Sequence, residues 1–410
     1  MKILHTSDWH LGKKLGTFSR ISEQRAVLDE LIELCIVQSP DLILISGDLF
    51  DAFNPPNEAV ELLYRSLKRL TRGGSCPVVA LAGNHDSPER VEAPDPLARE
   101  CGIFFLGYPD SLPGSVSLDS GVEADFPAPG LLELRFPHLK APARIIYAPY
   151  ANESRLRKYL GESDRDEALR RILQDSWNSL ADEFCTDESV NLFAGHFFMG
   201  KRDELFQDEQ EPEGERPILF PGGLEMIYTD NLPRTIQYAA LGHLHRYQMV
   251  AKTPIPVCYS GSPLAYSLSE AGQTKGVVMV EVEQGKKASY EFFPLKSGKP
   301  LLRKVFNGVE KLKSWLSENP GCYVEVTLKT DDYISGSVKQ ELLEMHDGIL
   351  AIIPQVEQGV DDSSSGRQVD LGRSVEELFT DYFTEQTGGT PPDGELLTLF
   401  REIVSSGGEE

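Results

Sequence analysis

Most of the histidines in this chain lie in five short polar segments, each at or near the end of an apparent strand. The segments are Asp8-Trp-His10, Gly47-Asp48, Gly83-Asn-His-Asp86, Gly195-His196 and Gly242-His-Leu-His245, and they contain five of the eight histidines. All but the first follow a clear apolar run, so their side chains should emerge at the carboxyl edge of a sheet. Open α/β sheets bind their ligands at that edge. The chain is therefore expected to be an α/β protein whose site is built from several strand ends.

The wider pattern agrees, because short apolar runs alternate with amphipathic helical stretches. The expected strands are Lys2–His5, Asp41–Ser46, Pro77–Ala82, Arg144–Ala148, Val190–Ala194, Ile236–Leu241 and Val257–Ser260. The expected helices lie within Phe18–Ser39, Asn57–Leu70 and Asp164–Phe184. From Lys275 two strand-like runs follow each other without a helix, joined by Gln284-Gly285, which predicts an antiparallel edge to the sheet.

Two polar linkers divide the chain. Lys296–Pro300 is expected to end a first domain of residues 1–297, and a small α/β module follows at 298–358. Its strand Cys322–Lys329 alternates, with Cys322, Val324, Val326 and Leu328 inward and Tyr323, Glu325, Thr327 and Lys329 outward. Residues 359–373 are expected to be a flexible linker, and 374–405 two short amphipathic helices. The apolar positions of these helices include Val375, Leu378, Phe379, Tyr382, Phe383, Leu396, Leu397 and Phe400.

The polar segments offer carboxylate, amide and imidazole ligands without a thiolate, which suits a borderline metal such as Mn, Fe or Zn. Seven candidate ligands are too many for one ordinary site, but two metals that share a carboxylate would use them all. The expected ligands are Asp8, His10, Asp48 and His245 for one metal, and Asp48, Asn84, His196 and His243 for the other, with Asp48 as the bridge. Two such ions can polarise a phosphoryl group, supply hydroxide and stabilise the leaving oxygen.

His85 has no metal in this assignment. It is expected either to stabilise the transition state or to protonate the leaving oxygen, with Asp86 orienting it. Each segment alone is a weak signal, since Gly83–Asp86 could by itself be a turn with a capping Asn, but the ordered set is specific. The remaining histidines, His5, His138 and His346, are expected to be packed or surface residues.

The charge of the chain bears on what it can bind. The formal net charge is −24, which argues against nucleic-acid binding because basic patches carry most non-specific affinity. Bound metals or a partner protein could supply the missing positive charge. No run approaches 18 apolar residues, so no membrane helix is expected. The six scattered cysteines are expected to be buried thiols in a reducing cytoplasm.

The ordered set DWH, GD, GNHD, GH and GHLH resembles the calcineurin-like metallophosphoesterases. Within that superfamily, Ser7–Gly12 (SDWHLG), Gly47–Asp51 (GDLFD) and Gly83–Pro88 (GNHDSP) are similar to the SbcD family of bacterial nuclease subunits. The resemblance extends to the small α/β module and the C-terminal helices, so it covers nearly the whole chain.

The resemblance implies a two-sheet sandwich flanked by helices, with a capping and DNA-recognition domain at 298–358. It implies two divalent metal ions, preferably Mn²⁺, with Mg²⁺, Fe²⁺ or Zn²⁺ as alternatives. The implied reaction is phosphodiester hydrolysis in DNA for end processing, repair and recombination. It would comprise 3′→5′ exonuclease action on duplex ends and endonuclease action on single strands and hairpins.

The resemblance also implies partners and a location. The C-terminal helices would bind the coiled-coil base of an SbcC-like SMC/ABC ATPase, and a second copy would bind through the nuclease domain. This chain has no GxxxxGK[ST] segment, so ATP hydrolysis would come from that partner. The expected location is the cytoplasm, in association with the nucleoid and without a membrane contact.

Two other functions fit the same fold. A phosphatase or phosphodiesterase acting on a small or protein substrate would use the same metals. Phosphoprotein phosphatases, however, usually show GDxVDRG and GNHE, where this chain has GDLFDAF and GNHDSP. A non-catalytic scaffold of this fold tends to lose metal ligands, and all of them are present here.

Overall fold

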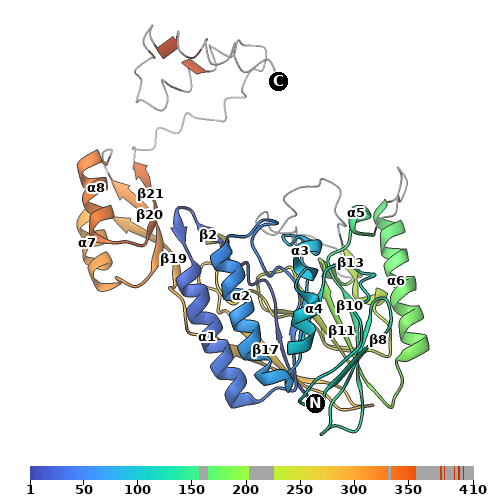
Figure 1. Ribbon diagram of the computed structural model, residues 1–410. Helices are drawn as coiled ribbons and strands as arrows, with labels where there is room; N and C mark the ends of the chain where they lie inside the picture. The colour runs from blue at the N-terminus through green and yellow to red at the C-terminus, as the bar shows by residue number, and fades with distance from the viewer. Residues whose placement is uncertain are drawn as a thin grey trace. The chain divides into compact units, whose positions relative to one another are not determined.

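The computed structural model describes residues 1–156, 165–202, 226–330 and 334–356, together with seven single positions between 379 and 400. The chain divides into two compact units, Met1–Val356 and Glu357–Glu410. The first unit contains the two large sheets that hold the polar segments (Figure 1).

The first large sheet has six strands. Their spatial order is β18 (Ser289–Pro294), β17 (Gly276–Glu281), β1 (Lys2–Thr6), β4 (Leu42–Ile45), β5 (Val78–Leu81) and β6 (Ile103–Leu106). The strands β1, β4, β5 and β6 are parallel, whereas β17 is antiparallel to both β1 and β18. The hairpin after Lys275 therefore forms an antiparallel edge, as the sequence predicts.

The second large sheet has eight strands. Their order is β15 (Gln248–Ala251), β16 (Val257–Tyr259), β14 (Tyr238–Gly242), β11 (Val190–His196), β10 (Ala143–Ala148), β9 (Leu131–Arg135), β8 (Glu123–Ala128) and β7 (Val116–Ser117). The strands β16, β14, β11 and β10 are parallel, and β9, β8 and β7 add an antiparallel meander that the sequence analysis did not identify.

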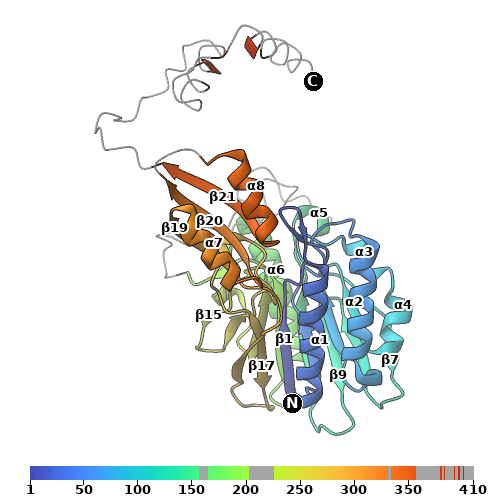
Figure 2. The same cartoon turned by 90° about the vertical axis from the view of Figure 1, so that its left-hand side faces the viewer.

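Helices cover the outer faces of the two sheets, which makes a four-layer sandwich. On the first sheet these are α1 (Ile21–Gln38) and α2 (Asn57–Leu70), side by side in Figure 2, and on the second it is α6 (Arg165–Phe184). Alternation along β4 shows the layering: Leu42 and Leu44 face the core between the sheets, whereas Ile43 and Ile45 face the helices. Because both faces are covered, central strands such as β4 (LILI) and β5 (VVAL) are apolar throughout.

The remaining short elements connect these layers. The α-helices among them are α3 (Pro88–Glu92), α4 (Asp95–Ala98) and α5 (Glu153–Leu156). The 3₁₀ turns are η1 (Arg72–Gly74), η2 (Arg99–Cys101), η3 (Thr229–Asn231) and η4 (Leu268–Glu270). The two-residue strands are β2 (Lys14–Leu15), β3 (Phe18–Ser19), β12 (Met199–Gly200) and β13 (Ile227–Tyr228).

A small βαβαβ module completes the first unit. Its elements are β19 (Leu301–Asn307), α7 (Val309–Glu318), β20 (Tyr323–Thr330), α8 (Gly336–Met345) and β21 (Ile349–Val356), and its strands are parallel. Cys322, Val324, Val326 and Leu328 are buried with the two helices, as predicted. Tyr323 departs from the prediction: it lies on the outward face yet is buried, because that end of the strand packs on Leu15 and beneath the Arg20 guanidinium.

Candidate metal centre

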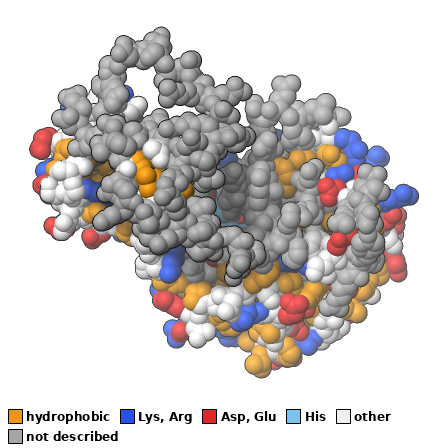
Figure 3. All heavy atoms as spheres, turned by 90° about the horizontal axis from the view of Figure 1, so that it is seen from above, with side chains coloured by type: hydrophobic (Ala, Val, Ile, Leu, Met, Phe, Trp, Pro, Cys, Tyr) orange, Lys and Arg blue, Asp and Glu red, His pale blue; other side chains and the backbone are white. Residues whose placement is uncertain are grey.

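The five polar segments meet at one edge of the two packed sheets. Asp8–His10, Asp48 and Asn84–Asp86 follow β1, β4 and β5 of the first sheet, while His196 ends β11 and His243–His245 follow β14 of the second. Parallel strands bring their carboxyl ends together. None of the predicted ligands is more than 6% exposed. The structure thus brings together every metal ligand that the sequence predicts, and Figure 3 looks onto this edge from above.

Asp8, His10 and His245 form the first group of potential ligands, with ligand atoms that all lie within 4.8 Å of one another. The Nε2 atoms of His10 and His245 face each other at 3.0 Å. Nδ1 of His245 lies 3.2 Å from a carboxylate oxygen of Glu270, which can only accept a hydrogen bond. The proton of a neutral His245 is therefore at Nδ1, and its Nε2 lone pair points at His10.

Asn84, His196 and His243 form the second group. Oδ1 of Asn84 lies 2.8 Å from Nε2 of His196 and 3.0 Å from Nδ1 of His243. Nδ1 of His196 donates to the carbonyl oxygen of Ser46 at 2.8 Å. In a neutral His196, Nε2 then faces Asn84 Oδ1 as one acceptor against another, an arrangement that is favourable only with a cation or a proton between them.

Asp48 lies between the two groups. Its Oδ2 atom is 3.4 Å from Nε2 of His10 and 3.5 Å from Nε2 of His196. Its other oxygen accepts the backbone N–H of His85 at 2.9 Å. A carboxylate that bridges two metal ions would have to occupy this position, so the geometry fits the role predicted for Asp48.

The electrostatics of the site also fit cations. Burial lowers the pKa of His196, but the carboxylates of Asp48 and Asp8 more than offset this effect and raise the pKa to about 9. Burial raises the pKa of Asp48, and the surrounding imidazoles, His196 foremost, outweigh it and hold that pKa well below its usual value. Buried carboxylates therefore need positive charge beside them. Together with the converging lone pairs, this donor set fits borderline divalent metals.

The backbone at four of the predicted ligands is in a region that residues other than glycine rarely adopt. Asp8, His10 and Asp48 have φ values of 54°, 43° and 50°, and His243 has a φ of 109°. Such conformations cost free energy and persist where the surroundings enforce them, often at functional sites.

Glycines in the polar segments let the ligands approach one another. A Cβ atom on Gly83 would lie 2.0 Å from Oδ1 of Asp48, and one on Gly47 would lie 2.1 Å from Nδ1 of His196. A Cβ on Gly242 would lie 1.8 Å from the carbonyl oxygen of Ser46. The glycines are therefore required by the packing of the site as well as by the turns.

His85 lies beside the first ligand group, with its ring edge-on to that of His10 and the ring centroids 4.8 Å apart. Its Nδ1 donates to the backbone carbonyl of Asp51 at 3.0 Å. Its Nε2 is buried and has no hydrogen-bond partner among the described residues. The ring thus presents one unengaged nitrogen next to the first ligand group.

Asp86 has a different role from the predicted one. Its carboxylate accepts the backbone N–H groups of Leu49, Phe50 and Gly83 at 2.8 to 3.0 Å. These bonds tie the segment after β4 to the segment after β5. The hydrogen bond on Nδ1 of His85 goes to the Asp51 carbonyl rather than to Asp86.

Three residues of the site have no assigned role in the sequence analysis. Asp51 accepts from Lys13 Nζ at 2.7 Å and lies 3.6 Å from Nδ1 of His10. Arg155 is buried and donates to the carbonyl oxygens of Gly83 and Asp86, so it holds both ends of the segment after β5. Glu270 accepts from His245. Only Asp51 had a local signal, because it ends the GDLFD segment.

The other predicted features are placed as follows. His5 and His346 are buried and hydrogen-bonded, and His138 lies at the surface beside Asp41. All six cysteines are free thiols, and five of them are buried. No helix among the described residues has the length and the apolar character that crossing a membrane requires.

In the second unit, some of the predicted partner-binding positions are described. The rings of Phe379 and Phe400 stack with their centroids 4.0 Å apart. The ring of Phe379 also lies near that of Phe383, with 5.9 Å between the two centroids. Leu396 and Leu397 are half-buried. Val375, Leu378, Tyr382 and the linker 359–373 lie outside the described residues.

Two family models match this chain. The family model described as calcineurin-like phosphoesterase matches residues 1–247, and one described as type 5 capsule protein repressor C-terminal domain matches residues 301–387.

Curated relatives extend the match to the whole chain. A protein of Bacillus subtilis that is named as the SbcD component of the nuclease SbcCD is 35% identical and covers all of this chain and 99% of its own length. The protein of the same name from Rhodobacter capsulatus is 32% identical over 77% of this chain and 75% of its own. The protein of the same name from Staphylococcus saprophyticus is 29% identical over 87% of this chain and 85% of its own length.

Proposed function

Because the chain belongs to the calcineurin-like phosphoesterases and, along its whole length, to the SbcD family of nuclease subunits, we propose that it is a metal-dependent DNA nuclease subunit. It hydrolyses phosphodiester bonds as part of a complex with an SbcC-like ATPase. The observation that carries this proposal is the convergence of all seven predicted ligands at one edge of the sheets, where their nitrogen and oxygen atoms lie close to one another.

Two divalent ions bound at this edge would supply the Lewis acidity and the nucleophile for hydrolysis. The residues of the chain divide the remaining tasks. Asp8, His10 and His245 would hold one ion, Asn84, His196 and His243 would hold the other, and Asp48 would contribute to both. The ligands are buried and pre-arranged by strained backbone, so little reorganisation is needed when the ions bind.

His85 moves a proton or binds the reacting phosphate through Nε2. The Asp51 carbonyl accepts Nδ1–H in both the neutral and the charged form of the ring, so Nε2 is the atom that gains or loses the proton. A charged ring donates from Nε2 to a phosphate oxygen or to the leaving oxygen, and both predicted roles use this atom.

The finer points of the activity are inferred from family membership. They are a preference for Mn²⁺, 3′→5′ exonuclease action on duplex ends, endonuclease action on single strands and hairpins, and work in DNA repair and recombination. We also infer a homodimer through residues 1–297, DNA recognition by the module at 298–358 and a cytoplasmic, nucleoid-associated location.

The helices at 374–405 are inferred to bind the coiled-coil base of the ATPase. The stacked Phe379 and Phe400 support this, because they give the second unit an aromatic cluster of its own. A short apolar helical element that recognises a partner helix needs such a cluster.

The acidity of the chain is compatible with this function in a complex. In Figure 3 acidic and basic side chains are interspersed over the part of this face that the structure describes. The net charge of −24 disfavours tight DNA binding by the chain alone. The ATPase partner is therefore inferred to supply most of the DNA affinity.

The test is cleavage of labelled single-stranded and hairpin DNA by the full chain with Mn²⁺, beside a chelator-treated sample. Cleavage that depends on Mn²⁺ is expected, together with hydrolysis of bis-p-nitrophenyl phosphate. Hydrolysis of p-nitrophenyl phosphate alone, with both diesters left intact, would instead favour a phosphomonoesterase.

Partner binding has a separate test. A chain that ends at Asp370 should lose co-purification with the ATPase while it keeps the metals and the hydrolysis of bis-p-nitrophenyl phosphate. Unchanged complex formation by this truncated chain would place the interface within residues 1–370.

A further inference from the structure

Glu270 is a buried carboxylate directly behind the metal-ligand candidate His245, and it lies outside the five polar segments. It ends the turn η4 and is 3% exposed. Its Oε1 atom is 3.2 Å from Nδ1 of His245. We infer that Glu270 is a positioning residue for His245, which sets the orientation and the tautomer of this imidazole for metal binding; the inference rests on the proposed function.

The contact determines which nitrogen of His245 is available. An ionised carboxylate accepts hydrogen bonds and cannot donate one, so Nδ1 of His245 carries the proton. Nε2 then presents its lone pair to the first ligand group, 3.0 Å from Nε2 of His10. Metal-binding histidines in general are held in this way by a carboxylate or a carbonyl on the other ring nitrogen.

Glu270 is itself held firmly, as a positioning residue must be. Its Oε1 atom also accepts the backbone N–H groups of Tyr266 and Ser267 at 3.1 and 3.0 Å. Its Oε2 atom pairs with Lys275 Nζ at 2.5 Å. The buried carboxylate of Glu270 therefore has a charged partner as well as hydrogen-bond donors.

Lys275 links the same carboxylate to the backbone of the ligand. Its ammonium group donates to the carbonyl oxygen of His245 at 2.7 Å as well as to Glu270. The Glu270–Lys275 pair thus contacts His245 at both the ring and the main chain. This double contact restricts the ring of His245. A carboxylate that only closed the η4 turn would not restrict it.

A purely structural role would give a different result from a positioning role. If Glu270 only stabilised its turn, its replacement would lower the stability of the protein and leave metal binding unchanged. If it positions His245, its replacement weakens binding of one of the two ions, because that ion loses a pre-oriented ligand.

The experiment compares the full-length wild type with Glu270→Gln, which keeps the size but has a single acceptor oxygen, so it cannot accept from both Nδ1 of His245 and the ammonium group of Lys275. The binding of Mn²⁺ is measured without DNA, from the electron paramagnetic resonance signal of the free ion. We expect two bound ions in both proteins, with one of them held about 10- to 100-fold more weakly in the variant. Cleavage assays should show a higher Mn²⁺ requirement and a kcat near that of the wild type at saturating Mn²⁺.

Glu23→Gln is the matched control. Glu23 is also a buried carboxylate, 8% exposed, and it pairs with a cation, Arg20, at 2.5 Å. No contact links it to a predicted ligand among the described residues. In the presence of chelator, Glu23→Gln should lower the melting temperature about as much as Glu270→Gln does. It should leave both Mn²⁺ affinities within about twofold of the wild type.

The outcomes separate this inference from the proposed function. If Glu270→Gln binds both ions as tightly as the wild type, the positioning role is wrong, while Mn²⁺-dependent cleavage by the wild type would still support the nuclease. If the wild type binds no Mn²⁺ or cleaves no phosphodiester, the proposed function itself fails. Should Glu270→Gln not fold, Glu270→Asp carries the test: it keeps the charge but withdraws the oxygen from Nδ1, and unchanged Mn²⁺ affinity would again overturn the inference.

Discussion

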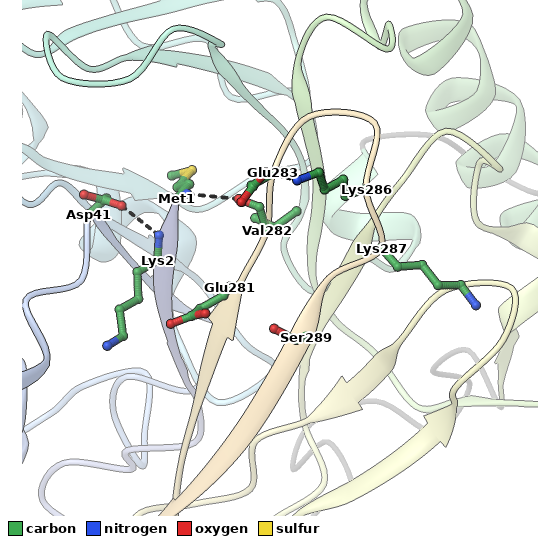
Figure 4. A pocket seen from close by; sticks show the side chains of 9 residues that line it. All are labelled: Met1, Lys2, Asp41, Glu281, Val282, Glu283, Lys286, Lys287 and Ser289. Atoms are coloured by element: carbon green, nitrogen blue, oxygen red, sulfur yellow. Dashed lines mark hydrogen bonds and ion pairs between the residues drawn. The ribbon is translucent and has the colours of Figure 1, made fainter.

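The two ends of the same sheets differ in what their charged groups do. At the carboxyl ends of β1, β4, β5, β11 and β14, the polar side chains are buried and point at one another. At the amino end of β1, a pocket of about 330 Å³ is lined by residues that include Met1, Lys2, Asp41 and Lys287 (Figure 4). Both ends contain titratable groups, yet only the first has the arrangement of a catalytic site.

The difference lies in how charges are compensated. At the amino end, charges pair locally and near solvent: the Glu283 and Lys286 side chains pair while 66% and 68% exposed, and the backbone N–H of Lys2 donates to Asp41 at 2.7 Å. At the carboxyl ends, Nε2 of His10 faces Nε2 of His245 and Oδ1 of Asn84 faces Nε2 of His196, so each pair is favourable only with a proton or a cation between its two atoms. The presence of charged residues therefore does not identify a site; buried ligand atoms that converge on one another do.

The sharpest test of this contrast is Asp48→Asn. The amide cannot bridge two ions as a carboxylate does, so we expect metal content to fall below two per chain and cleavage to drop on the order of 10⁴-fold or more. Asp41→Asn at the opposite end should keep both metals and full activity. Metal content is measured by mass spectrometry of the desalted protein. Two metals and full activity in Asp48→Asn would show that Asp48 is not the bridge.

His85→Gln tests whether metal binding and proton transfer at the carboxyl edge depend on different residues. The variant should retain two metals, because His85 has no assigned ion, and should lose cleavage by roughly 10²- to 10³-fold. The loss should appear in kcat with little change in the Mn²⁺ requirement, unlike that of Glu270→Gln. Wild-type cleavage by this variant would remove His85 from the mechanism.

The carboxyl edge was largely predictable from sequence because its signals are local. Each ligand stands at the end of a strand or within four residues after it, and the glycines beside the ligands mark turns. Gly83 and Gly47 have a further reason that the sequence cannot show, since it is the closeness of Asp48 and His196 that excludes a Cβ.

The missed residues act through tertiary contacts. Glu270 is 25 positions beyond His245, and Arg155 reaches Gly83 from a separate helix, so neither has a pattern in its own neighbourhood. Tyr323 shows the same limit in another form: the alternation of β20 gives its face correctly but not what packs against that face. The orientation of His85 by Asp51 rather than Asp86 also depends on how two loops meet.

His5 lies in β1 directly before its last residue, between the pocket at Lys2 and the predicted ligand Asp8, and gives the comparison a pH dependence. Burial lowers its pKa to about 3, although a hydrogen bond to the Leu241 carbonyl opposes this. The unfolded chain binds this proton near pH 6.5. The contribution of a neutral His5 to stability is therefore complete above pH 6.5 and is lost as the pH falls towards 3.

Between pH 7 and pH 5 this loss amounts to roughly 2 kcal/mol. Urea unfolding of chelator-treated protein should show it as a difference between the wild type and His5→Gln, which has no titrating group at this position. Because both proteins are free of metal, protonation of the metal ligands contributes equally to both stability curves and cancels in the difference. Parallel stability curves over this pH range would show that His5 does not titrate on unfolding.

The smallest effect is expected at the amino end, for His138→Ala. His138 is 2.8 Å from Asp41, but its side chain is 53% exposed, so solvent screens this ion pair. Asp41 keeps its bond from the Lys2 backbone when His138 is removed. The free energy of unfolding should therefore change by no more than about 0.5 kcal/mol, with metal content unchanged. A loss above about 2 kcal/mol would mean that charges at this end depend on one another as strongly as those of the metal centre do, and the contrast between the two ends would no longer hold.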